Sequence, residues 1–164
     1  MTNKTTAKTV KIPRGIRNNN PLNIEYHDRN KWHGQLKYNK IVEPRFCRFE
    51  HMMWGYRAAA CLLRKYIRAY GLTTVKEIIN MWAPPRENQT SAYIKQVCNL
   101  ANMYESTIVD FNDQMQMLAL MSAMTVVENG AEYNPQLNSV IWDAMYKGYK
   151  MAQANVTNFE NVEG

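Results

Sequence analysis

The segment from Asn112 to Gly130, NDQMQMLALMSAMTVVENG, restricts the fold more than any other part of the chain. Its apolar residues recur with helical spacing and also fill the remaining faces, which is typical of a helix buried on nearly all sides. Asn112 or Asp113 is suited to cap its start, and Gly130 supplies the left-handed residue that ends it. We therefore expect a mainly helical domain built around this segment.

Glu128 is the charged residue at the far end of this segment. Desolvation and the negative end of the helix dipole should both disfavour its ionised form and raise its pKa. A carboxylic acid that stays protonated near neutral pH can act as a general acid. The alternative is a carboxylate that turns out to solvent beside Asn129 and Gly130.

The length of 164 residues and the hydrophobic content of 46% suit one domain with its own core. We expect a flexible basic arm over residues 1–13, a single domain over 14–154 and a frayed polar tail over 155–164. The arm lacks the apolar segment of a signal peptide, and no run of the sequence is long and apolar enough to span a membrane.

The charge is unevenly distributed. Residues 1–72 carry a net charge of +11, whereas residues 73–164 carry −5. A basic half suits a polyanion such as nucleic acid, an anionic cell-wall polymer or the inner surface of a virion, although a solvated basic surface is also common. Cys47, Cys61 and Cys98 lack metal-ligand spacing, so we expect reduced cysteines, no metal site and no cofactor.

Near the N-terminus, RGIRNNNPLNIEY (14–26) predicts a structured polar loop that leads into a short strand over Leu22–Tyr26. Trp32-His33-Gly34 and the residues up to Val42 suggest a small hairpin or an irregular β lobe. Asparagine amides beside aromatic rings are also the residue types that hold sugars.

Helical periodicity begins after Phe46. One long helix is expected from about His51 to Tyr70, closed by Gly71, and a Thr74-x-x-Glu77 capping box should start the next. The remaining expectations are that this second helix ends at Trp82 before Pro84-Pro85, that Thr90 caps a third, and that Asn134-Pro135 starts a last helix with Leu137, Val140, Ile141, Ala144, Met145 and Tyr149 inward.

Four pieces of the chain together resemble a phage and prophage family of lysozyme-like virion or lytic proteins. The resemblance runs from about Arg14 to Gly130, and its most specific part is WAPPRENQTSAYI. The pieces are RGIRNNNPLNI followed by Trp32-x-Gly34, FCRFEHMMWGYRAAACLLRKY, WAPPRENQTSAYIKQV and VVENG. The resemblance implies a mainly α (α+β) lysozyme-like domain with a small irregular β lobe.

The order of these pieces is also distantly similar to bacterial glucosaminidase and lytic transglycosylase domains. In those domains the helix that carries the catalytic Glu comes first, whereas here Glu128 lies near the end. We therefore interpret the chain as a circularly permuted lysozyme-like domain, which is admissible because the termini of compact domains often lie close together.

The resemblance implies a peptidoglycan-cleaving glycosidase of the lytic transglycosylase, muramidase or glucosaminidase type. Glu128 would be the general acid, and Glu87 and Glu50 are the other catalytic candidates. None of Glu25, Asp28, Glu43 and Glu50 has a spacing that marks it as the second catalytic group, which favours assistance from the substrate N-acetyl group. The expected glycan-binding residues are Asn19, Asn20, Asn23, Trp32, Trp82, Asn88 and Tyr93.

Two alternatives from other classes stay open. One is a non-catalytic virion structural protein, and the other is a basic helical nucleic-acid-binding domain. The glycosidase interpretation predicts peptidoglycan strands and other virion proteins as partners, whereas only the last alternative requires nucleic acid. The expected location is a phage virion, or the cytoplasm with release to the periplasm and cell wall by lysis or a dedicated secretion machine.

Overall fold

A computed structural model describes residues 11–85 and 89–154. Within these ranges the protein is mainly helical, and its elements are α1 (Arg14–Arg17), α2 (Met52–Arg68), α3 (Val75–Trp82), α4 (Thr90–Ala101), α5 (Gln114–Asn129), the 3₁₀ turns η1 (Ala131–Tyr133) and η2 (Pro135–Leu137), and α6 (Ser139–Ala154). The expected tail over 155–164, most of the arm over 1–13, and the candidates Glu87 and Asn88 lie outside the described residues.

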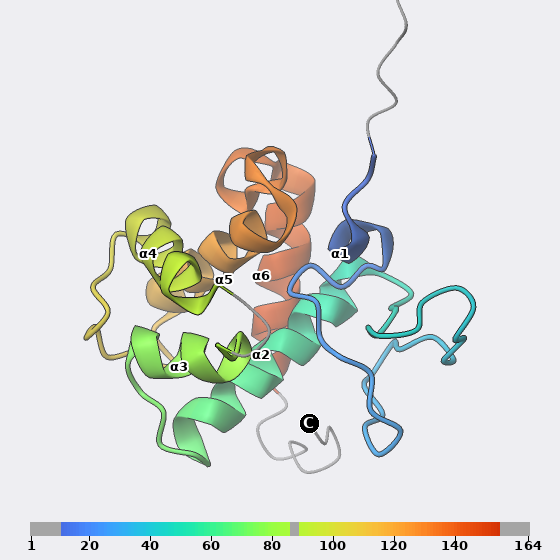
Figure 1. The fold of residues 1–164 in the computed structure, drawn as a ribbon, viewed down its shortest axis with the longest axis horizontal. Helices are drawn as coiled ribbons and strands as arrows, with labels where there is room; N and C mark the ends of the chain where they lie inside the picture. The colour runs from blue at the N-terminus through green and yellow to red at the C-terminus, as the bar shows by residue number, and fades with distance from the viewer. Residues whose placement is uncertain (1–10, 86–88, 155–164) are drawn as a thin grey trace, which may run out of the picture.

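Helix α2 runs diagonally through the molecule and packs along α6, with α3 and α4 on one side and the irregular N-terminal lobe on the other (Figure 1). The two helices approach closely at Gly148, where a Cβ would lie 2.7 Å from the backbone nitrogen of Arg57. A larger residue would therefore force the helices apart.

Helix α5 is buried as its sequence predicts. Its residues from Met117 to Thr125 are buried, except Ala119, which is half-buried. The Asp113 side chain accepts a hydrogen bond from the Gln116 backbone nitrogen and caps the start, and Gly130 ends the helix with a positive φ of +103°. The Tyr56 hydroxyl joins α2 to α5 through a buried 2.8 Å hydrogen bond with the Thr125 hydroxyl.

The predicted start of α2 and both predicted ends of α3 agree with the structure, whereas α2 ends at Arg68, two residues before the expected Tyr70. His51 caps α2, and the Thr74–Glu77 capping box is formed in full at the start of α3. The expected cap of α4 is wrong: Thr90 is the first helical residue, and its hydroxyl donates to the Ala83 carbonyl instead.

The start of the last helix also differs from the prediction. Asn134 and Pro135 begin the turn η2, whereas α6 starts at Ser139, with the Asn138 side chain accepting from the Ile141 backbone nitrogen. Leu137 and Val140 are therefore 85% and 76% exposed rather than inward, because they precede or open the helix instead of lying along its buried face. Ile141, Ala144, Met145 and Tyr149 are buried as expected.

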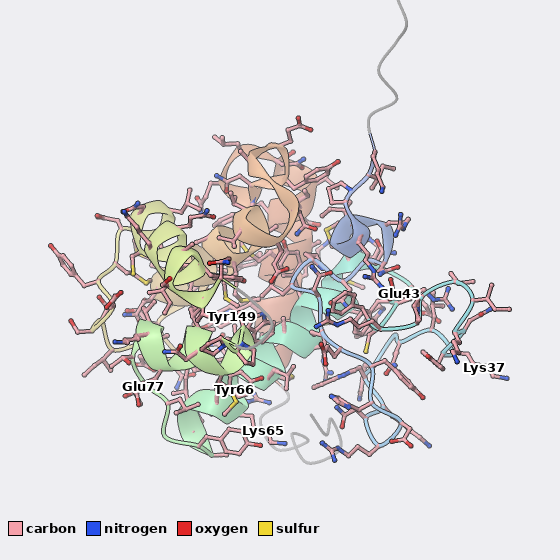
Figure 2. All side chains as sticks on the ribbon, in the orientation of Figure 1. Lys37, Glu43, Lys65, Tyr66, Glu77 and Tyr149 are labelled. Carbon is pink, nitrogen blue, oxygen red and sulfur yellow. The ribbon has the colours of Figure 1, made fainter. Side chains whose placement is uncertain are left out.

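The lobe between α1 and α2 forms no strand within residues 18–51, all of which are described. The expected strand over Leu22–Tyr26 is wrong: only isolated antiparallel bridges form, Glu25 with Phe46 and Gln35 with Phe49. Separate backbone hydrogen bonds, such as those from Tyr26 to Arg45 and from Leu36 to Arg48, hold this lobe together with side-chain contacts. Glu43 accepts two 2.6 Å hydrogen bonds from the Arg14 guanidinium and one of 3.0 Å from Asn18 (Figure 2 labels Glu43).

The cysteines and the helix lengths complete the comparison with the sequence. Cys47, Cys61 and Cys98 are free thiols. Among the described residues, no helix combines the length and the apolar character that crossing a membrane requires.

Candidate active site

The C-terminal end of α5 docks against the asparagine-rich loop that follows α1. Asn129 donates a 2.7 Å hydrogen bond to the Pro21 carbonyl and a second, of 3.0 Å, to the Thr125 carbonyl of its own helix. Next to it, Glu128 accepts a 2.7 Å hydrogen bond from the Asn23 side chain. The ENG and NNNPLN motifs, about a hundred residues apart in sequence, are thus parts of one site.

Tyr93 of α4 is the second partner of Glu128. Its hydroxyl donates to Oε1 of Glu128 at 3.2 Å, while Asn23 holds Oε2. The Tyr93 ring is 8% exposed, so three separate segments fix the carboxyl group in a partly buried position. The alternative in which Glu128 turns freely into solvent does not match this geometry.

Burial raises the pKa of Glu128, because desolvation penalises the carboxylate more than the neutral acid. The hydrogen bonds from Asn23 and Tyr93 and the positive charge of Arg45 act in the opposite direction but do not cancel the effect of burial. The pKa of Tyr93 is raised well above its ordinary value by burial and by the neighbouring carboxyl, so its hydroxyl keeps its proton. The site therefore holds a carboxylic acid whose pKa lies above the ordinary value for Glu.

Glu128 lies in the wall of a cleft of about 440 Å³ between the N-terminal lobe and the helices α2 and α3. One side of the cleft is aromatic and apolar, formed by Tyr66, Tyr70, Met81 and Trp82. The Tyr66 ring stands edge-on to Trp82 with 6.0 Å between centroids and stacks on Tyr70 at the same separation. The lobe supplies the other side with Asn23, Glu25, His27, Arg29, Asn30 and Arg45.

The structure brings four of the predicted site residues together, namely Asn23, Trp82, Tyr93 and Glu128. Asn23 adopts a left-handed φ of +54°, a conformation that asparagine tolerates better than most residues. This backbone turn places its amide on the Glu128 side of the loop.

Four other residues predicted for the site do not line the cleft. Asn20 is fully buried and uses its amide to bind the backbone of Ile24 and Cys47, while Asn19 donates to the Phe49 carbonyl. Trp32 is 5% exposed and belongs to the core, and Glu50 is exposed but does not line the cleft. Asn19, Asn20 and Trp32 therefore shape the lobe behind the site.

Sequence reasoning missed the contribution of the last turn of α2. Lys65, Tyr66 and Tyr70 line the cleft, and Figure 2 shows Lys65 and Tyr66 together near the C-terminal end of this helix. Tyr70 is 51% exposed. The spacing of Tyr66 and Tyr70, one helical turn apart and near Trp82, was the signal available in the sequence.

Over 139 residues the chain is 36% identical to Protein P5 of Pseudoalteromonas phage PM2, a match that covers 84% of this chain and 80% of that protein. No protein-family profile matches the chain.

Proposed function

The chain belongs to the family of Protein P5 of Pseudoalteromonas phage PM2, and we propose that it is a peptidoglycan-cleaving glycosidase with Glu128 as its general acid. The observation that carries the proposal is the carboxyl of Glu128, held by Asn23 and Tyr93 in the wall of a cleft and biased towards its protonated form. Cleavage of a glycosidic bond begins with a proton donated to the leaving oxygen, and such an acid can supply it.

The aromatic side of the cleft supports a sugar substrate. Tyr66, Tyr70 and Trp82 offer flat apolar faces, which pack against the C–H faces of pyranose rings. The cleft is open enough for a polymer to lie across it, since Tyr70 and Met81 are 51% and 43% exposed. A glycan strand lying on these residues would pass beside Glu128.

The second catalytic group is the N-acetyl group of the substrate in this proposal. Glu25 is the other carboxylate in the cleft lining, and its Oε1 accepts a 2.6 Å ion-pair hydrogen bond from Arg45. In this proposal Glu25 serves in that ion pair and is not the nucleophile. Glu43 is buried behind the loop in its pair with Arg14, so neither lobe acid is suited to attack the sugar.

The fold proposed with this function is a lysozyme-like domain with circularly permuted order. The hydrogen bonds that α5 makes to the asparagine loop support it, because they put the helix bearing the acid beside the loop that it would precede in an unpermuted chain. Asn134 and the turns η1 and η2 then lead away from the site into α6.

The test is peptidoglycan cleavage by the full chain and three variants. Glu128→Gln keeps the size of the side chain and should lose about 10²- to 10⁴-fold in rate, the contribution typical of a general acid. Glu50→Gln tests the competing candidate, and Glu105→Gln removes an exposed carboxylate outside the cleft as a matched control. Both should retain activity, and an anhydro product by mass spectrometry would identify a transglycosylase.

A non-catalytic virion component is the second candidate function. Membership of a phage protein family supports it, as do the exposed apolar side chains Leu100, Leu137 and Val140 on α4, η2 and α6, which suit contacts with neighbouring subunits. This candidate predicts that the wild type and Glu128→Gln are equally inactive on peptidoglycan.

A further inference from the structure

The charges in the cleft suggest what kind of strand it takes. Three permanent cations line it, Arg29, Arg45 and Lys65, against two carboxyl groups, Glu25 and Glu128. Glu25 forms the ion pair with Arg45, and the cations outnumber the carboxyl groups whether Glu128 is protonated or ionised. The lining is therefore positive overall.

Positively charged side chains lie on both sides of the cleft. Lys65 places its ammonium 5.8 Å from the centroid of the Tyr70 ring, so this cation borders the surface on which a sugar would lie. Arg29 belongs to the lobe and is exposed on the other side of the cleft. A neutral glycan can only hydrogen-bond to these groups, whereas carboxylate groups projecting from a strand would also form ion pairs with them on either side of the cleft.

We propose that the cleft selects glycan strands that carry carboxylate groups, with Arg29 and Lys65 as the residues that recognise them. This inference rests on the proposed glycosidase function and names its substrate class. In peptidoglycan the carboxylates have two sources, the peptide stems and, where a stem has been removed, the lactyl group of the muramic acid.

The experiment compares one substrate with and without its charge. Native peptidoglycan is treated with carbodiimide and ammonia, which converts the carboxyl groups into neutral amides and leaves the glycan bonds intact. We expect kcat/KM of the wild type to be about tenfold higher on native than on amidated material, the size of two exposed charge interactions. A higher salt concentration should reduce this difference.

Variants assign the effect to the cleft. Arg29→Gln with Lys65→Gln should lower kcat/KM on native peptidoglycan by a larger factor than on amidated peptidoglycan, so that the ratio between the two substrates falls towards one. The control pair Lys76→Gln with Lys95→Gln removes the same charge from α3 and α4, outside the cleft, and should keep the wild-type ratio. Strands stripped by an amidase distinguish the sources: undiminished cleavage identifies the lactyl carboxylate, and slow cleavage the stems.

Other outcomes would overturn the proposal. Equal rates of the wild type on native and amidated peptidoglycan, or equal losses on both in the Arg29/Lys65 variant, would refute the charge selection while the glycosidase function stands. If the wild type cleaves neither substrate, the glycosidase function fails and the selection fails with it.

Discussion

Asn23 and Glu128 are 105 positions apart in the chain and are joined by a 2.7 Å hydrogen bond at the wall of the cleft. The bond holds one carboxyl oxygen in place, while Tyr93 holds the other. Because the hydroxyl of a tyrosine can both donate and accept, Tyr93 can follow the carboxyl through its protonated and ionised forms. The protonation of Glu128 is thus tied to two residues that can each be varied.

Tyr93→Phe should move the alkaline limb of the pH–rate profile to higher pH. The Tyr93 hydroxyl donates to the carboxylate and thereby lowers the pKa of Glu128, so its removal should raise that pKa further. The acid would then stay protonated over a wider range. The measurement is kcat/KM on peptidoglycan against pH, with an NMR titration of the Glu128 carboxyl as a second readout; a limb displaced to lower pH would contradict this role.

Glu128→Gln should stabilise the fold at alkaline pH. The pKa of Glu128 is raised in the folded state, so the folded protein binds this proton more tightly than the unfolded chain. The associated stability is complete below the ordinary Glu pKa of about 4.3 and is lost as the pH rises through the folded pKa. Thermal unfolding should therefore show the variant above the wild type at high pH, with the gap closing in acid.

Arg14→Ala should destabilise the protein by about 2 kcal/mol, because it leaves Glu43 buried without its cation. The loss is less than for a fully buried pair, since Arg14 is 41% exposed and the backbone nitrogens of Arg45 and Phe46 still donate to Glu43. Arg17→Ala, exposed on the same short helix, is the matched control and should change the free energy of unfolding by less than about 0.5 kcal/mol.

The same pair makes an acid-dependent contribution to stability. The Arg14 guanidinium holds the pKa of Glu43 far below its ordinary value. The contribution is present above the ordinary Glu pKa of about 4.3 and declines as the pH falls towards the lower folded value. Chemical unfolding at pH 7 and pH 3 should show the difference between wild type and Arg14→Ala shrinking in acid; a constant difference would show that the pair is not responsible.

Tyr70→Ala should raise KM with little change in kcat. Its exposed ring belongs to the aromatic side of the cleft, and the hydrogen bonds of Glu128 come from Asn23 and Tyr93, so under the proposed function Tyr70 should contribute to binding rather than to proton transfer. A loss of about 0.5–1.5 kcal/mol of packing corresponds to roughly a two- to tenfold rise in KM. Tyr104→Ala, 80% exposed and outside the cleft, should leave KM unchanged.

Gly15→Ala should impair the site without touching a charged group. A Cβ at this position in α1 would lie 2.5 Å from Oδ1 of Asn129 and 3.1 Å from Oδ1 of Asn23. Both side chains would have to move, and the movement of Asn23 would disturb its hydrogen bond to Glu128. We expect a cost of about 1–3 kcal/mol in stability together with reduced kcat, measured on the same preparation.

Local rules were sufficient to predict the long helices. The capping box at Thr74, the cap at Asp113 and the all-round apolar character of α5 each depend on neighbours within one or two turns, and the structure agrees with each. The prediction that Thr90 caps α4 was wrong because the Thr90 hydroxyl donates to the Ala83 carbonyl. Leu137 and Val140 failed because apolar periodicity does not reveal where a turn ends and a helix begins.

The site was predictable where chemistry and position coincide, as at the acid on the buried helix and at Asn23, Trp82 and Tyr93. The sequence could not show which asparagines cross-link the loop and which face the cleft, because the side chain is the same in both roles. Their hydrogen-bond partners separate them: Asn23 donates to Glu128, whereas Asn19 and Asn20 donate to backbone carbonyls of the lobe. Likewise, the pairing of Glu25 with Arg45 depends on how a lobe without strands folds over.

The distance along the chain between the asparagine loop and the end of α5 also has a consequence for synthesis. A ribosome makes Asn23 early, Tyr93 later and Glu128 near the end, so a nascent chain that stops at α4 holds both partners but not the acid. Closing a contact of this span is among the slower steps of folding. The carboxyl takes its place in the wall of the cleft only when that contact forms, so the incomplete chain carries no assembled acid.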